Sequence, residues 1–409
     1  MAILPYIYLG YMFVALYMLL LFIFIFLKNQ DKFHYYPETK KKYTISVIIP
    51  AYNEESSIES TVNAVSKSNY PIEEIIVIND GSTDKTSQVL DSLSKKMPIL
   101  KVITKKNSGK ADSLNKGIAV ARGELIAVVD SDSYPKPDAI EKMIGYFNNK
   151  NIGSVTSTIL VTNKEKFIEK LQAIEYAIIA WSRKLLEFID GIWVTPGPLA
   201  LYRKDIVLKI GGFDTKNLTE DIELTWRLVH YGYKIRMATP AVVYTTVPTR
   251  FKHWFKQRIR WNMGGLQTLW KYKKDVLTKG LGSFIIPFFT ISLFLGVFGI
   301  GVFLYVSTRN IIKNYFYTTY SFQAGSDLLR LDQFYITPTV LNVFGIFMFF
   351  LGLFFTIFAL NYIKQHEFLK KKNAFVFMFY LIIYLTIYPF LLIASFYKFI
   401  TRNYSWGTR

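Results

Sequence analysis

The sequence predicts an α/β domain with an open, mostly parallel sheet and flanking helices, inserted between transmembrane helices. Two observations support this fold class. Four apolar stretches, one before residue 28 and three after residue 280, are long enough to cross a membrane as helices. Between them, over residues 44–248, short β-branched apolar segments alternate with amphipathic helical patterns, which is the order expected of parallel strands joined by crossover helices.

Composition narrows the class of protein. Of the 409 residues, 51% are hydrophobic and 19% are charged, which is more apolar than a soluble domain needs. The sequence has no cysteine, so any metal must bind oxygen or histidine. The net charge of +19 does not indicate a nucleic acid partner, because no nucleic-acid motif is present and the basic clusters lie beside the apolar stretches. Attraction to anionic membrane lipids explains those clusters.

The apolar stretches predict one anchor before the domain and three spans after it. Residues 1–28 are expected to form a retained anchor, because no basic residue precedes the apolar run and lysines follow it, unlike in a signal peptide. Residues 249–280 are expected to form amphipathic helices at the membrane interface. The remaining segments are the spans at 281–307, 334–360 and 374–397, and a tail at 398–409.

The lysines beside the four spans predict the topology. They fall on one side of a cell membrane if the chain crosses it four times, and that side is then the cytoplasm. The domain is therefore expected in the cytoplasm, with the amino terminus and the tail outside, although Lys398, Arg402 and Arg409 in the tail oppose this orientation. The supporting residues are Lys28, Lys40–Lys42, Lys271, Lys273, Lys274, Lys279, Lys364 and Lys370–Lys372.

Within the domain, four strands are expected in "YTISVIIP", "IEEIIVIND", "LKVITKK" and "ELIAVVD", with a helical pattern between each pair. Ligands of open α/β sheets bind beyond the carboxyl ends of the strands. Asn53, Asp80 and Asp130 all fall at such ends, so we expect them to line one crevice.

Asp130 and Asp132 follow an apolar strand that we expect at Leu125–Val129. In an extended chain, residues i and i+2 project to the same side, so the two carboxylates can meet one cation while Ser131 faces away. Mg²⁺ or Mn²⁺ held by one or two carboxylates completes its shell with water and substrate phosphates. The alternative is a polar turn without a ligand.

Two further segments supply candidate nucleotide contacts. Asp80 precedes Gly81 at the tip of a strand, where its carboxylate can accept a hydrogen bond from a base or a ribose. A common Asx-type turn is the alternative. Lys110 and Asp112 open the next helix after a glycine, which allows lysine and amide nitrogens to approach a phosphate. A capped helix explains this segment equally well.

Glu220 and Asp221 begin an amphipathic helix in "LTEDIELTWRL". Acidic residues stabilise the amino end of a helix through its dipole, which is the structural alternative. Displacement of a leaving group from a sugar carbon by a hydroxyl needs a base that takes the hydroxyl proton. Asp221 is the candidate base, and Glu220 is the second choice.

The segment "FKHWFKQRIRWNMGG" mixes aromatic and basic residues directly before the second span. It fits an amphipathic helix at the membrane interface. In addition, Gln257, Arg258 and Arg260 offer hydrogen-bond donors for a diphosphate, and Trp261 offers an aromatic face on which a sugar ring can rest.

Taken in order, "PAYNEE", "NDGS", "GKADSLN", "DSD", "TED" and "QRIRW" resemble the inverting, membrane-embedded family 2 glycosyltransferases, which include the cellulose, chitin, hyaluronan and poly-N-acetylglucosamine synthases. The resemblance implies a GT-A-like fold. It also implies that Asp80 contacts the nucleotide, that Asp130 and Asp132 face the diphosphate and its metal, and that Asp221 is the base. Gln257, Arg260 and Trp261 would hold pyrophosphate and acceptor.

The loop "TPGPLALYR", residues 195–203, lies where that family keeps an acceptor-contacting loop. Pro196 and Pro198 depart from the glycine and small residues usual there, which leaves the type of acceptor open.

The resemblance implies an enzyme that moves a sugar from a nucleotide-sugar donor, most simply a UDP-sugar, to a growing polysaccharide and secretes it through its membrane helices. Transfer of a single sugar to a lipid-linked acceptor of the polyprenyl or dolichyl phosphate type is the second hypothesis. A non-catalytic nucleotide-sugar sensor is the third, and the presence of Asp130, Asp132 and Asp221 argues against it.

Overall fold

An eight-stranded open sheet forms the centre of the computed structural model, which describes residues 3–278, 280–323 and 340–402. The strand order is β3-β2-β1-β4-β7-β6-β8-β5. β1 pairs in parallel with β2 and β4, whereas β7 runs antiparallel between β4 and β6. This confirms the predicted open, mostly parallel sheet. The strands are β1 (Ile45–Ala51), β2 (Glu74–Asn79), β3 (Leu100–Thr104), β4 (Leu125–Val128), β5 (Ser133–Pro135), β6 (Ile152–Val161), β7 (Ala200–Arg203) and β8 (Lys234–Thr245).

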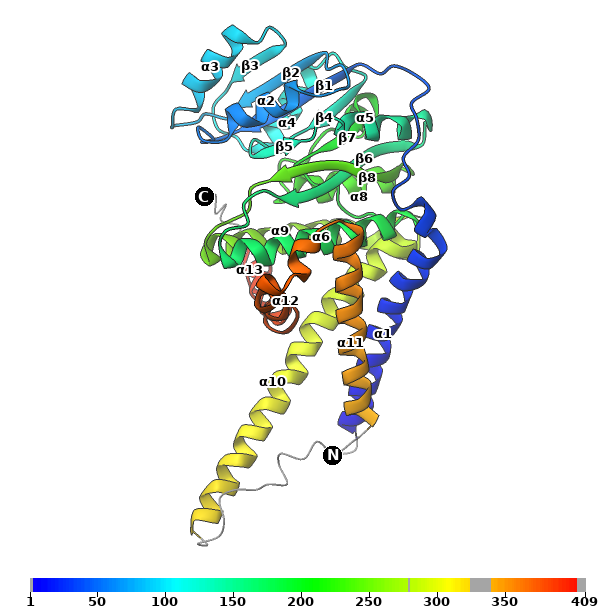
Figure 1. Ribbon diagram of the computed structural model, residues 1–409, viewed down its shortest axis with the longest axis vertical. Coiled ribbons are helices and arrows are strands. Elements are labelled where there is room, and N and C mark those ends of the chain that lie inside the picture. The colour runs from blue at the N-terminus through cyan, green and yellow to red at the C-terminus, as the bar shows by residue number, and fades with distance from the viewer. Residues whose placement is uncertain (1–2, 279, 324–339, 403–409) are drawn as a thin grey trace.

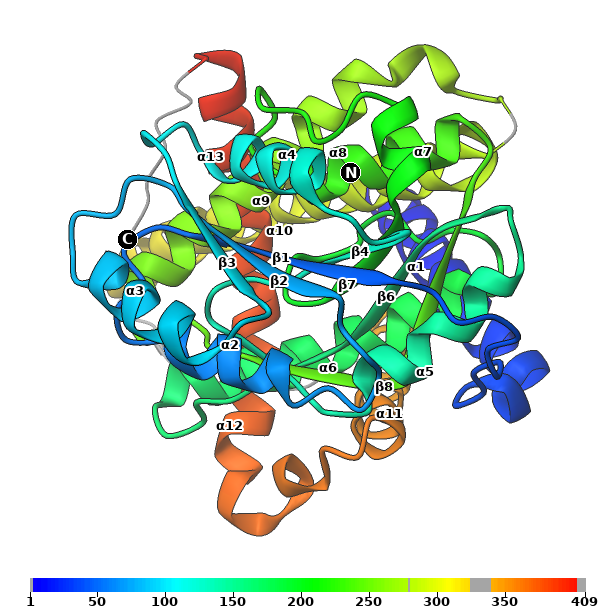
Figure 2. The same ribbon diagram turned by 90° about the horizontal axis from the view of Figure 1, so that it is seen from above.

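Helices cover both faces of the sheet, so every residue of β1 is buried. Val47 and Ile49 belong to a core shared with α2 and α5, whereas Ile48 belongs to the opposite core, which includes α4 and α8. Figure 2 shows these two pairs of helices on opposite sides of the sheet. Burial on both faces explains why the strand sequences are apolar without alternation. The helices of the domain are α2 (Ile58–Ser66), α3 (Thr86–Lys96), α4 (Lys110–Val120), α5 (Ala139–Ile144), α7 (Lys204–Lys209) and α8 (Glu220–His230).

Two long helices, α6 (Phe167–Glu187) and α9 (Phe251–Lys271), form a layer beneath the sheet (Figure 1). On its lower side α6 packs against the apolar helices, with the Trp181 ring 4.6 Å from that of Phe355 and 5.7 Å from that of Phe26. The layer formed by α6 and α9 therefore lies between the sheet and the apolar helices.

Four helical segments are long and apolar enough to cross a membrane, one before the domain and three after it, as predicted. The first, Tyr6–Lys32, overlaps α1 (Ile3–Asn29). The second contains α10 (Ile286–Gln323), which continues past the predicted end at residue 307 because Arg309 and Lys313 interrupt the apolar run but not the helix. The third, Val343–Tyr362, lies within α11 (Val340–Tyr362), and residues 334–339 of the predicted span lie outside the described residues. The last contains α12 (Ala374–Phe379) and α13 (Leu385–Ile400).

Candidate active site

The loops after β1 and β2 are joined through Asn53. This residue has a left-handed backbone, with φ of 55°. Its side-chain oxygen accepts a hydrogen bond from the backbone N–H of Thr83 at 2.8 Å, and its own N–H donates to the Ser82 hydroxyl at 3.0 Å. Asn53 thus joins the two loops that follow the carboxyl ends of these strands.

Asp80 organises the loop that leads into α4. Its carboxylate accepts hydrogen bonds from the backbone N–H groups of Ser108 and Gly109, both at 2.9 Å, and forms an ion pair with Lys105 at 2.5 Å. Asp112 joins the same cluster through Lys105 at 2.9 Å. In this arrangement Asp80 and Asp112 bind protein groups. Their predicted contact with a nucleotide remains a prediction.

Lys110, the first residue of α4, connects two acidic residues from distant parts of the chain. Its Nζ lies 2.5 Å from Oδ1 of Asp130, just beyond β4, and 3.1 Å from Oε1 of Glu220, at the start of α8. Burial would lower the pKa of Lys110, but Asp130, Glu220 and Asp221 raise it above its usual value. Lys110 is therefore a fixed positive charge between Asp130 and Glu220.

The segment that contains Asp130 and Asp132 is a turn, so the prediction of an extended chain was wrong. β4 already ends at Val128, and the N–H of Ser133 donates to the carbonyl oxygen of Asp130 at 3.1 Å. The chain reverses here because β5 must pair with β8. Oδ1 of Asp132 lies 3.5 Å from the hydroxyl of Thr245 on β8.

Hard oxygen donors of this kind suit Mg²⁺ or Mn²⁺. Among the described residues, no group of three acidic or histidine side chains that could hold a metal is present. A cation at Asp130 and Asp132 would therefore need further ligands from substrate or water.

Gly197 brings the loop 195–203 against the central ion pair. Its carbonyl oxygen accepts a hydrogen bond from the N–H of Asp130 at 3.1 Å. A Cβ atom at this position would lie 2.5 Å from Oδ1 of Asp130 and 2.6 Å from Nζ of Lys110. Only glycine therefore leaves room for this approach. Thr195 fixes the start of the loop through hydrogen bonds with the hydroxyls of Tyr202 and Thr225, at 2.8 and 2.7 Å.

Glu220 and Asp221 are neighbours at the amino end of α8, but their pKa values shift in opposite directions. Burial would raise the pKa of Glu220, yet the charges of Lys110 and Arg260 lower it. Burial, and then the negative charge of Glu220, raise the pKa of Asp221 to about 7. An acidic pair with separated pKa values is typical of a site in which one carboxylate exchanges a proton. Asp221 is the member suited to do so near neutral pH.

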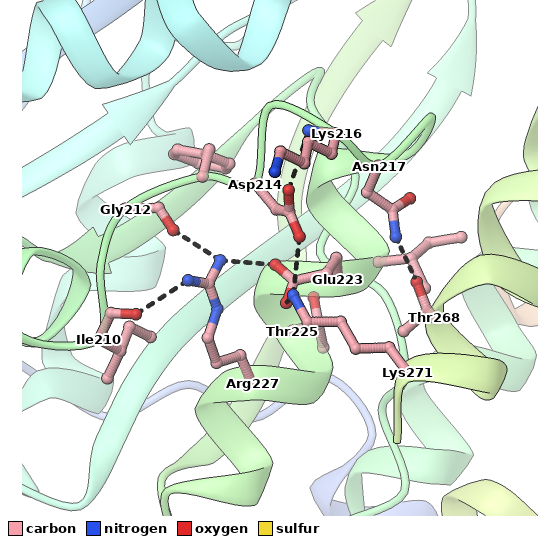
Figure 3. A network of polar contacts seen from close by, with 12 residues as sticks. Ile210, Gly212, Asp214, Lys216, Asn217, Glu223, Thr225, Arg227, Thr268 and Lys271 are labelled. Atoms are coloured by element: carbon pink, nitrogen blue, oxygen red, sulfur yellow. Dashed lines mark hydrogen bonds and ion pairs between the residues drawn. The ribbon is translucent and has the colours of Figure 1, made fainter. Parts of the chain in front are cut away.

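A polar network fixes α8, which carries Asp221, to α9 (Figure 3). The carboxylate of Glu223 is fully buried and binds Arg227 at 2.5 Å, Lys271 at 2.7 Å and the hydroxyl of Tyr272 at 3.0 Å. Lys271 and Tyr272 lie at the end of α9. Because buried charges need several partners, this network holds the two helices in one relative position.

The two arginines of the QRIRW motif, Arg258 and Arg260, lie on α9 and have different surroundings. Arg258 is buried, with an ion pair to Glu175 of α6 at 2.6 Å and hydrogen bonds to the side chain of Gln257 at 2.6 Å and the hydroxyl of Tyr388 at 3.2 Å. Its guanidinium also lies 4.1 Å from the ring centroid of Trp261. This arrangement does not support the predicted diphosphate contact of Arg258. Arg260, by contrast, lowers the pKa of Glu220 through its positive charge.

Three residues of α6 near this site were not singled out from the sequence. They are Glu175, Tyr176 and Arg183. Tyr176 lies within the electrostatic reach of Asp130 and Asp132, and Arg183 within that of Asp221. The available signal was the occurrence of three charged residues in the otherwise apolar run "AIEYAIIAWSRKLL". Such residues in a buried helix usually have a partner or a function.

Comparison with known proteins identifies relatives of the domain. Residues 46–211 match the family model described as glycosyl transferase family 2. A poly-beta-1,6-N-acetyl-D-glucosamine synthase from Staphylococcus epidermidis is 34% identical over 283 residues, which cover 68% of this chain and 68% of that protein. The synthase of the same name from Staphylococcus aureus (strain COL) is 33% identical over 247 residues, which cover 60% of each chain.

A solved structure shares the fold over almost the whole chain. It is a mannosyltransferase from Pyrobaculum calidifontis in complex with GDP-Man and Mn²⁺. The TM-score is 0.61, over 99% of this chain and 98% of that chain, at 17% sequence identity. At this identity the match shows a common fold.

Proposed function

We propose, because this chain belongs to glycosyl transferase family 2, that it moves a sugar from a UDP-sugar to a growing polysaccharide. The chain is a glycosyltransferase, and its relatives named as poly-beta-1,6-N-acetyl-D-glucosamine synthases support N-acetylglucosamine as the sugar. The observation that carries the proposal is the position of Asp221, with its raised pKa, beside the Lys110–Glu220 ion pair.

This arrangement fits an inverting transfer. A hydroxyl of the acceptor gives its proton to the Asp221 carboxylate while its oxygen forms a bond to the anomeric carbon of the donor sugar. The bond from that carbon to the diphosphate breaks on the opposite side, and the nucleoside diphosphate leaves with the electron pair. Lys110 and Arg260 supply positive charge on the side where the leaving diphosphate would develop negative charge.

Asp130 and Asp132 would hold Mg²⁺ or Mn²⁺ at the diphosphate. Two carboxylates are a suitable oxygen donor set, and the substrate phosphates would supply further ligands. When bound, the ion neutralises charge on the diphosphate. The family and the Mn²⁺ in the mannosyltransferase complex support this dependence on a divalent metal.

A base with a pKa of about 7 also favours a glycan hydroxyl over a lipid phosphate as the acceptor. The second ionisation of a phosphate monoester lies near pH 6, so a lipid phosphate is already an anion and needs no base. A sugar hydroxyl does need one, because it must lose its proton as it attacks. Asp221 therefore supports a hydroxyl acceptor, such as the end of a glycan, rather than the phosphate of a lipid.

The protein is a multi-pass membrane protein. We infer that its domain faces the cytoplasm, where nucleotide sugars are made, and that the product leaves along the membrane helices. The segment that follows α11 bears Lys370–Lys372 and contacts the domain through the ion pair of Glu367 with Lys164 at 2.6 Å. These lysines therefore lie on the domain side of the membrane, as the bias of basic residues toward the cytoplasm requires. There they can also meet anionic lipid head groups.

Purified protein incubated with UDP-N-acetylglucosamine and Mg²⁺ or Mn²⁺ tests the proposal. We expect a ladder of products by mass spectrometry, and no ladder from Asp221→Asn. The matched control is Asp91→Asn, since Asp91 lies on the exposed face of α3. A wild-type preparation that releases UDP but adds a single sugar to lipid would contradict the polysaccharide proposal.

A further inference from the structure

The guanidinium of Arg258 on α9 is fixed by a carboxylate of α6. Arg258 and Glu175 are both buried, with 2% and 5% of their surface exposed. Nη2 of Arg258 donates a hydrogen bond to Oε2 of Glu175 at 2.6 Å, and Nε donates to Oε1 at 3.3 Å. Two nitrogens thus meet both oxygens of one carboxylate, which fixes the plane of the guanidinium as well as its position.

Two tyrosines of the last apolar segment complete this cluster. The hydroxyl of Tyr384 donates to Oε2 of Glu175 at 2.7 Å, and the hydroxyl of Tyr388 accepts a hydrogen bond from Nε of Arg258 at 3.2 Å. Tyr384 ends a turn of π-helix, Tyr380–Tyr384, that joins α12 to α13. Single turns of this kind are rare and occur frequently at functional sites. The segment that packs against α9 from below (Figure 1) therefore takes part in fixing Arg258.

Arg258 in turn contacts both of its neighbours in the QRIRW motif that are expected to hold pyrophosphate and acceptor. Trp261 lies three residues later, on the same face of α9, and its ring centroid is 4.1 Å from the guanidinium. Nη1 of Arg258 donates to the side-chain oxygen of Gln257 at 2.6 Å. Because a guanidinium can only donate, it must meet the amide oxygen, so the NH2 group of Gln257 points away from Arg258. Arg258 thus sets the orientation of both side chains.

We infer that Glu175 and Tyr384 are positioning residues for the acceptor glycan, which act through Arg258 to hold the indole of Trp261 in the plane on which the acceptor sugar stacks. This inference rests on the proposed function. A binding side chain must be held in a narrow range of orientations, and supporting hydrogen bonds do this. The cluster also gives a reason for an arginine at position 258. A lysine has no planar fork that can bind a carboxylate and lie on an indole at the same time.

The test uses Tyr384→Phe, which keeps the ring and removes one hydroxyl from the cluster, alone and combined with Trp261→Ala. The full-length proteins in detergent are given UDP-N-acetylglucosamine, Mn²⁺ and increasing concentrations of a β-1,6-linked N-acetylglucosamine pentasaccharide. Three quantities are measured: the KM for the pentasaccharide, the KM for the donor, and the Tm. Tyr397→Phe is the matched control, because Tyr397 lies on α13 and is 70% exposed.

We expect Tyr384→Phe to raise the KM for the pentasaccharide by about threefold or more, as is usual for coupled residues of one hydrogen-bond network, without a change in the KM for the donor. In the Trp261→Ala protein the same substitution should raise the KM no further, because the indole through which Tyr384 acts is absent. Glu175→Gln should follow the same pattern with a larger effect, because it leaves the buried charge of Arg258 unbalanced. Tyr397→Phe should change none of the three quantities.

Three results would overturn the inference. If the wild type extends the pentasaccharide and Tyr384→Phe has the same KM for it, the cluster does not position the acceptor, while the proposed function stands. A lower Tm with an equal rise in KM whether or not Trp261 is present would show that the cluster only holds the helices together. If the wild type extends no glycan but modifies a lipid phosphate, the proposed function itself fails, and an inference about a glycan acceptor fails with it.

Discussion

Lys110 and Asp130 form an ion pair, with Nζ 2.5 Å from Oδ1, and the loop at Gly197 packs directly on this pair. α4 contributes the lysine and the turn after β4 contributes the aspartate. The positions of the two charged side chains therefore depend on close packing by an uncharged residue of this loop, Gly197.

Gly197→Ala should impair transfer without unfolding the protein. The added methyl group would lie 2.5 Å from Oδ1 of Asp130, so the ion pair or the loop must move. Displacements of about 1 Å in a catalytic site can cost on the order of a hundredfold in rate, and we expect at least a tenfold loss of kcat. Gly301→Ala is the control, because a Cβ atom there meets no atom within 4 Å. Equal activity of both variants would show that the loop yields freely.

Asp132→Asn should remove most activity while the protein remains folded in the membrane. One anionic ligand near the diphosphate is lost, so a higher concentration of Mg²⁺ or Mn²⁺ should be needed for the residual rate. The measurement is a metal titration of transfer, with donor binding followed in parallel. Transfer by the variant at the wild-type rate in excess chelator would contradict the assignment of Asp132 as a metal ligand.

Asp221→Asn should lower transfer by about 10² to 10⁴-fold, the usual contribution of a general base, because an amide cannot take the hydroxyl proton. Size and polarity are conserved, so donor binding should remain. If transfer falls less than tenfold while the nucleotide still binds, the base lies elsewhere, and Glu220 is the first alternative.

The pH dependence of transfer should report the raised pKa of Asp221. The charged groups that act on the pKa of Asp221 are Glu220, Lys110 and Asp130. Because the base must be ionised, kcat should increase as pH rises through about 7. Stability should change in the opposite sense. Asp221 keeps its proton to a higher pH in the folded state than in the unfolded chain. Its contribution therefore lowers the free energy of unfolding progressively as pH rises from the pKa of the unfolded chain to that of the folded state.

Comparison of wild type and Asp221→Asn checks the sign of this stability change. In the wild type, ionisation of Asp221 destabilises the folded state as pH rises, and the asparagine variant cannot ionise. The Tm of the variant relative to the wild type should therefore increase as pH rises from 4 toward 7 and then stay constant. A constant Tm difference across this range would show that the pKa of Asp221 is not raised.

The sequence allowed prediction of the elements whose signals are local. Strands buried on both faces are recognisable as apolar runs, and Lys110, Asp130 and Glu220 follow from strand ends and helix starts. Contacts between distant segments were not predictable. The turn at Asp130 exists because β5 pairs with β8 more than 100 residues later, as in the pair Ser133–Thr245. The ion pair of Arg258 with Glu175 likewise depends on how α9 packs on α6, and no local sequence pattern indicates that packing.

Trp261→Ala should separate polymer synthesis from single transfer. Arg258 covers one face of the indole at 4.1 Å, so a sugar ring has to stack on the other face. Loss of that contact should weaken the hold on the acceptor end, so the variant should give shorter products while it still hydrolyses donor with water. Trp270→Ala on the same helix is the control, because Trp270 lies at the exposed end of α9. Product lengths are compared as mass ladders at increasing donor concentration. If the wild type gives one discrete lipid adduct at every concentration, Trp261 does not guide a growing chain, and transfer of a single sugar becomes the better account.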